Sequence, residues 1–163
     1  MSTRFATVTA GSVVLLAAFA VVGETPPSTD ASALSQDLRA LLQAEMKELQ
    51  AGVQTVAASL PSGNWDAIAT SAVAMKQSYV LEKKLTEALK QELAGLPDGF
   101  KALDERFHER AEKLAVAARS RDAEAVSFQF SRLLETCAAC HASYAQAQFP
   151  AFKAPPPTEP HHH

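Results

Sequence analysis

Two cysteines and a histidine lie close together near the C-terminal end of the chain. Cys137, Cys140 and His141 form the sequence Cys-Ala-Ala-Cys-His, and the chain of 163 residues contains 2 cysteines in all. On a helix, positions i, i+3 and i+4 share one face. Two thiols on that face can form thioethers with the vinyl groups along one edge of a porphyrin, and the histidine behind them can bind the iron. The motif therefore predicts one covalently attached haem c, with His141 as the proximal ligand.

Other uses of this motif fit the rest of the sequence less well. A zinc site needs about four ligands, so His108 and the histidines of the tail would have to join the two cysteines. A redox-active C-x-x-C motif lies within a βαβ pattern, whereas this one lies inside a predicted helix with no strand before it. A structural disulfide would leave His141 without a role. Haem attachment uses all three side chains.

The sequence before and after the motif predicts a helical domain. It is rich in Ala, Leu, Glu and Lys and shows no strand-like alternation. Apolar residues spaced three and four apart predict four helices, over residues 31–60, 65–93, 100–119 and 123–148. Asn64 and Asp122 are the expected N-caps of the second and fourth helices, and Pro150 is expected to stop the fourth. Short connections favour antiparallel neighbours, so we expect an all-α, up-down-up-down four-helix bundle carrying the haem. This domain spans residues 31–149, and a proline-rich tail, with three final histidines that resemble a tag remnant, covers 150–163.

The N-terminal segment has the pattern of an export signal. Arg4 supplies a positive charge, residues 6–23 are largely apolar, and small residues offer cleavage sites before a polar segment. We predict a signal peptide over residues 1–23 and a linker over 24–30. The alternative is an uncleaved anchor, because the apolar run is close to the minimum of about 17 residues that spans a bilayer. The domain is then expected in the periplasm, either free or anchored and facing it.

Charge and residue pattern also narrow the function. The formal net charge is -3, and basic residues are interleaved with acidic ones. No nucleic-acid partner is expected, because the chain lacks a basic patch. The sequence shows neither paired carboxylates at a cleft nor a nucleophile beside a base, so we do not expect an enzyme.

The second axial ligand of the iron separates the remaining functions. A thioether there gives a six-coordinate iron suited to electron transfer, and an open position gives an iron that binds small gases. The first and fourth predicted helices can be aligned antiparallel from Leu60 and Asp122. Met46 and Thr136 then lie at one level, each about fourteen residues along its helix, so Met46 is within about two turns of His141. Met46 is therefore the expected distal ligand; the alternative is that it only fills the core.

Two other side chains compete for the distal position. Met75 lies on the second predicted helix, about one turn from the same level. His108 flanks the apolar stripe of the third helix, where we expect a surface histidine. Both are weaker candidates than Met46.

This position of the motif, late in the last helix of a four-helix bundle, resembles the cytochrome c-prime family, the class II c-type cytochromes. The resemblance covers nearly all of the chain after the linker. Its best parts are "LQAEMK" (residues 42–47), "FKALDERFHERAEKLAVAARSRD" (100–122) and "CAACHASY" (137–144). The resemblance implies a haem-bearing four-helix fold, and Met46 implies the low-spin, methionine-ligated branch of the family.

The resemblance also assigns roles to individual residues. Gln43 matches a position that hydrogen-bonds a haem propionate, and Tyr144 matches an aromatic residue of the haem pocket. Leu42 and Ala145 depart from the pattern, because the family has an arginine and a basic residue at these positions. The propionate salt bridge and the positive charge near His141 are therefore not expected here.

These observations lead to one main functional prediction and two alternatives. The main prediction is a monohaem electron carrier that exchanges electrons with redox partner proteins. One alternative is a five-coordinate cytochrome that binds NO or CO, in which Met46 is only bulky. The other is a haem subunit of a larger membrane complex, which requires that the N-terminal segment is retained. Bundles of this kind can also pair through their first two helices, which is compatible with a homodimer.

Overall fold

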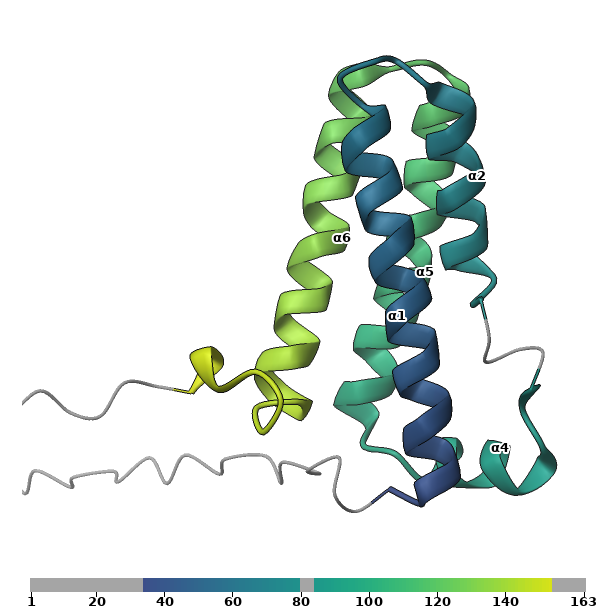
Figure 1. The fold of residues 1–163 in the computed structure, drawn as a ribbon, viewed down its shortest axis with the longest axis vertical. Coiled ribbons are helices and arrows are strands. Elements are labelled where there is room, and N and C mark those ends of the chain that lie inside the picture. The colour runs from purple at the N-terminus through teal and green to yellow at the C-terminus, as the bar shows by residue number, and fades with distance from the viewer. Residues whose placement is uncertain (1–33, 80–83, 154–163) are drawn as a thin grey trace, which may run out of the picture.

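The computed structural model describes residues 34–79 and 84–153, and every regular element in these two ranges is helical. Four helices run antiparallel to their chain neighbours as a bundle (Figure 1): α1 (Gln36–Ser59), α2 (Trp65–Lys76), α5 (Asp98–Arg119) and α6 (Ala123–Tyr144). The short helix α4 (Glu87–Ala94) lies at one end, and a 3-10 turn η2 (Pro150–Phe152) follows α6. The predicted all-α, four-helix fold is confirmed. The predicted signal peptide, the linker and most of the tail lie outside the described residues.

Polar side chains begin the helices where the sequence places them. The Ser35 hydroxyl accepts a hydrogen bond from the backbone N–H of Leu38, at 3.1 Å. Asn64 and Asp122, the caps predicted for the second and fourth helices, accept from backbone N–H groups at 3.3 and 2.9 Å. Each contact satisfies one of the donors that a helix start leaves without an intrahelical partner.

Apart from the buried Leu38, Leu41 and Leu96, the hydrophobic core lies toward the end of the bundle away from the motif. Its buried residues come from the second half of α1, from α2, from α5 and from the first half of α6: Val56, Ile68, Ala72, Met75, Phe107, Ala111, Leu114, Ala115, Ala117, Ala118, Val126 and Leu133. Small alanines on α5 allow close approach of its neighbours, and α5 packs against both α2 and α6. α1 packs against α2, and it diverges from α6 toward the end that carries the motif (Figure 1).

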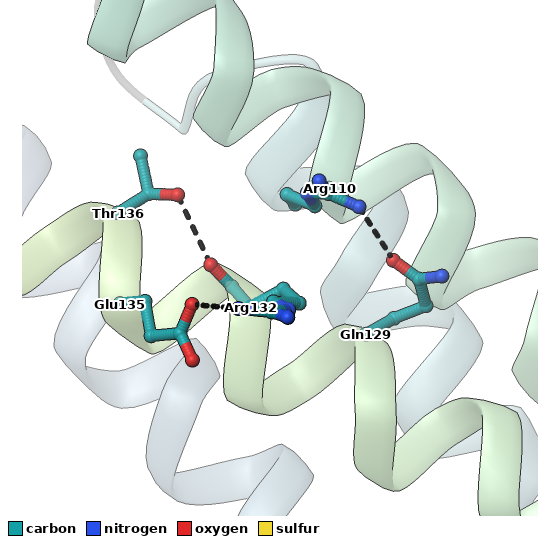
Figure 2. A network of polar contacts seen from close by, with 5 residues as sticks. All are labelled: Arg110, Gln129, Arg132, Glu135 and Thr136. Carbon is teal, nitrogen blue, oxygen red and sulfur yellow. Dashed lines mark hydrogen bonds and ion pairs between the residues drawn. The ribbon is translucent and has the colours of Figure 1, made fainter.

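The seam between α5 and α6 is polar along its outer edge (Figure 2). Arg110 donates to the Gln129 side chain at 3.4 Å, and Arg132 forms an ion pair with Glu135 at 2.6 Å. The buried Thr136 hydroxyl donates to the Arg132 carbonyl at 3.0 Å. Arg110, Arg132, Glu135 and Thr136 border an open groove of about 430 Å³. The Arg110–Gln129 bond joins α5 to α6, whereas the other two contacts lie within α6. Because α6 packs against α5, α5 sets the position of the motif more directly than α1 does.

The second predicted helix, over residues 65–93, is wrong as one continuous element. α2 ends at Lys76, and Ser78 has a left-handed φ of 57°, which no α-helix contains. The backbone N–H of Tyr79 donates instead to a carboxylate oxygen of Glu45 on α1, at 2.9 Å. A side chain from another helix therefore takes the hydrogen bond that a continuing helix would have used.

The fourth predicted helix, over residues 123–148, is also too long. α6 ends at Tyr144, and the next residue, Ala145, has left the helical region with φ −133° and ψ 26°. Its N–H still donates to the carbonyl of His141, at 3.1 Å. Pro150 was expected to stop the helix, but the chain turns before reaching it.

We expect Glu45→Ala to destabilise the fold, because it removes the acceptor of the Tyr79 N–H at the end of α2. The Glu45 side chain is almost fully covered, with 2% of the residue exposed. Loss of a buried acceptor should lower the free energy of unfolding by about 1–3 kcal/mol in urea titrations. Glu45→Gln keeps an oxygen acceptor and should recover part of this loss. The matched control is Glu48→Ala, an exposed position on the same helix, which should change stability by less than about 0.5 kcal/mol. Equal effects at both positions would show that the contact does not stabilise the fold.

Candidate haem site

The three residues of the motif share one face of α6 near its C-terminal end. Cys137, Cys140 and His141 are all half-buried, and Cys137 packs against the core cluster. The same face carries the buried Leu133 one turn earlier and the half-buried Tyr144 one turn later. The structure thus brings together the three residues that the sequence assigned to haem attachment, on a helix whose periodicity positions them without any loop.

Both cysteines are unpaired thiols in the structure. Burial raises the pKa of Cys137, and burial together with the Asp104 carboxylate and the neighbouring Cys137 raises the pKa of Cys140 to about 11. At neutral pH both groups are therefore protonated. A C-x-x-C redox centre instead lowers the pKa of its attacking cysteine. This environment supports a thiol pair kept for attachment over an activated dithiol.

The described residues also bear on the zinc interpretation. Within residues 34–79 and 84–153, no group of three or more His, Cys, Asp or Glu side chains is arranged to hold a metal ion. His108, which would have had to contribute, lies on α5 with Nε2 at 3.7 Å from the Asp104 carboxylate. The Asp104 carboxylate raises the pKa of His108 against the opposing effect of burial. This histidine is therefore paired with an acid on its own helix.

The expectation that His108 lies on the surface is wrong. The side chain of His108 is 28% exposed. Its ring packs edge-on against the ring of Phe107, with centroids 5.6 Å apart. The Lys76 backbone and the Glu45 carboxylate also contribute to its raised pKa. The end of α2 thus covers this position, which the prediction of a longer second helix did not anticipate.

The core cluster covers only part of α1 and only part of α6. Among the described residues, Leu49 is the most N-terminal side chain of α1 that packs on the core cluster, and Cys137 is the most C-terminal on α6. On α1 the buried face continues past Leu49 to Glu45, Leu41 and Leu38. Met46 lies one turn before Leu49 and is exposed, and His141 lies one turn after Cys137 and is half-buried. Neither of these two side chains packs on the core cluster. A porphyrin attached to the two thiols would cover the half-buried face of α6 beside His141.

The two methionines of the described chain differ sharply in environment. Met75 is 0% exposed and belongs to the core, where its methyl group lies against Gly52. Met46 is 45% exposed on α1, although it is a large apolar side chain. Met75 thus fills the core, whereas the side chain of Met46 is exposed on α1. The residues present therefore fit a haem held by the motif, with Met46 as the candidate for its distal side.

The two pocket residues taken from the family resemblance lie in different settings. Tyr144 packs edge-on against Phe100, with ring centroids 5.5 Å apart. Its hydroxyl lies so close to Gly99 that a Cβ added there would be 2.5 Å from it. Gln43 is exposed on α1, three residues before Met46. Tyr144 therefore ties the last turn of α6 to the first turn of α5, and the propionate role of Gln43 stays a prediction.

One contact of the motif was not predicted from the sequence. The ring of Phe149, beyond the end of α6, stacks on the His141 imidazole with centroids 4.2 Å apart and planes 12° from parallel. The aromatic residues around Pro150, in the sequence Phe-Pro-Ala-Phe, are the signal that could have indicated a contact of this segment with the bundle.

Comparison with known proteins agrees with the motif and its setting. The sequence model of the family described as Cytochrome C' matches residues 80–145, a segment that contains the whole motif. Proteins of that family bind a covalently attached c-type haem. Neither the curated proteins nor the solved structures gave a match to this chain. The match supports the resemblance seen in the sequence and does not extend to α1, where Met46 lies.

Proposed function

We propose that this chain is a monohaem c-type cytochrome of the cytochrome C' family that carries single electrons between redox partners. Cys137 and Cys140 hold the haem as thioethers, and His141 and Met46 bind the iron from opposite sides. One observation carries the choice of function: Met46, a large apolar side chain on α1, is 45% exposed and lies outside the core cluster, as His141 on α6 does. A thioether ligand opposite histidine favours electron transfer and raises the reduction potential.

The chain and the cofactor have separate tasks in this proposal. A bound c-type haem supplies the iron that accepts and releases one electron. The chain holds that group on α6, which packs against α5 and is bonded to it through Arg110 and Gln129. The chain offers binding and positioning groups, so we propose a carrier and not an enzyme.

The proposed setting is the periplasm, with electrons exchanged between partner proteins. Proteins of the Cytochrome C' family are typically periplasmic. In the described part of the chain, no helix has the length and apolarity that a membrane crossing needs. The predicted signal peptide would account for export, and mass spectrometry of the purified protein tests it. Loss of residues 1–23 supports a free carrier, whereas an intact N-terminus supports the membrane-complex alternative.

The absorption spectrum of the haem-loaded protein tests the proposed function. We expect low-spin spectra in the ferric and ferrous states, a thioether-to-iron charge-transfer band in the ferric state, and little reaction of the ferrous protein with carbon monoxide. A high-spin ferrous spectrum with ready binding of carbon monoxide would instead establish the gas-binding alternative and overturn the electron-carrier proposal.

A further inference from the structure

The chain turns back on itself directly after α6. Ala145 leaves the helical conformation, and its carbonyl accepts hydrogen bonds from the N–H groups of Gln148 and Phe149, both at 3.0 Å. The turn η2 follows, with the N–H of Phe152 donating to the Phe149 carbonyl at 3.1 Å. This short hydrogen-bonded segment returns the chain toward the last turn of α6 (Figure 1).

The turn brings Phe149 onto the face of His141. The two rings are nearly parallel, with an angle of 12° and centroids 4.2 Å apart. Phe149 remains 40% exposed, so the contact is not simply a consequence of filling the core. A stacked aromatic partner restricts rotation of the ring that it covers and shields one of its faces.

The contact comes from outside the part of the chain that matches the family. The Cytochrome C' model matches residues 80–145, and the stacking ring lies at Phe149. Ala145 also stands where the family resemblance places a basic residue next to the motif. The ring that lies against His141 therefore comes from the segment after α6, residues 145–153, and not from a neighbouring basic residue.

We propose that Phe149 is a positioning residue for the proximal ligand: its ring fixes the plane of the His141 imidazole and covers one of its faces. The proposal rests on haem ligation by His141, as inferred above. By fixing the orientation of His141, the ring would affect the electronic structure of the iron from its proximal side. Haem attachment itself, which depends on Cys137 and Cys140, should not require it.

Leucine substitutions at Phe149 and Phe152, the two phenylalanines after α6, test the proposal. Phe149→Leu keeps an apolar side chain but removes the stack, and Phe152→Leu makes the same change at a neighbouring exposed ring. The readout is the proton NMR spectrum of the ferric, haem-loaded protein, in which the spread of the haem methyl resonances depends on the orientation of the axial imidazole. We expect Phe149→Leu to change the order or spread of these resonances. Phe152→Leu should leave them as in the unsubstituted protein, and Phe149→Tyr should restore the original pattern.

The outcomes separate this proposal from the proposed function. An unchanged methyl pattern in Phe149→Leu overturns the positioning role, and so does an equal change in Phe152→Leu. The stack concerns only the proximal side, whereas electron transfer was argued from Met46 on the distal side. A carbon monoxide-binding wild-type protein would thus contradict the proposed function and leave the NMR comparison of the leucine variants valid.

Discussion

Replacing Cys137 and Cys140 together by serine is expected to abolish covalent haem attachment. The two thiols are the only groups on this face of α6 that can form thioethers, and both are unpaired. A hydroxyl cannot take their place in this chemistry. After denaturing electrophoresis, haem staining of the double variant should fall to background, whereas the unsubstituted protein should stain at the full chain mass.

Single variants and a matched serine control sharpen this prediction. Each single substitution leaves one thioether and one unsaturated vinyl group, so the pyridine haemochrome band should shift to longer wavelength. Ser143→Ala changes an exposed residue on the same turn as Cys140 and His141, and it should retain both staining and band position. Haem that stays bound through denaturation in the double variant would contradict attachment at this motif.

The part of the site contained in one helix could be predicted from the sequence. Cys137, Cys140 and His141 lie within five consecutive positions of α6, so helical periodicity alone places them on one face. The predicted caps Asn64 and Asp122 were confirmed for the same reason, because each bonds to the first turn of its own helix. Interactions between residues a few positions apart on one helix can be predicted from the sequence alone.

The break in the second predicted helix could not be found in this way. It depends on the Tyr79 N–H reaching Glu45, which is 34 residues away in the sequence and on another helix. A weaker local signal did exist, because the Thr86 hydroxyl accepts from the N–H of Leu89 at 3.3 Å and caps a new helix, α4. The apolar periodicity continues through the start of α4, so it predicted one long helix. The contact between Tyr79 and Glu45 favours the break instead.

The stack of Phe149 on His141 illustrates the same limit at the site itself. The residues that form it are separated by the end of α6, and the position of that end was predicted too late. The backbone at Ala145 and the hydrogen bonds of the following turn determine where the ring lies. Apolar periodicity predicts neither the backbone conformation at Ala145 nor the hydrogen bonds of the turn. The contact between Phe149 and His141 could therefore be found only from the structure.

Met46→Ala is expected to convert the iron from low-spin to high-spin and to lower its reduction potential. Alanine has no atom that can bind iron, so the distal position would be left to water or to an added ligand. A methionine opposite histidine raises the potential of a cytochrome, and its loss reverses this effect. The charge-transfer band of the ferric protein should disappear, and the ferrous protein should bind carbon monoxide, which absorption spectroscopy and redox titration would measure.

Met75→Ala provides the matched control, because the same chemical change is made in a different environment. Met75 is 0% exposed in the core, so its truncation should lower the free energy of unfolding by about 2–5 kcal/mol and leave the spectrum unchanged. Met46 is 45% exposed and lies outside the core cluster, so its effect should be mainly spectroscopic. The two variants thus separate ligation from packing. A Met46→Ala protein that keeps the low-spin spectrum would show that another group binds the distal side, and a spectral change in Met75→Ala would point to that methionine instead.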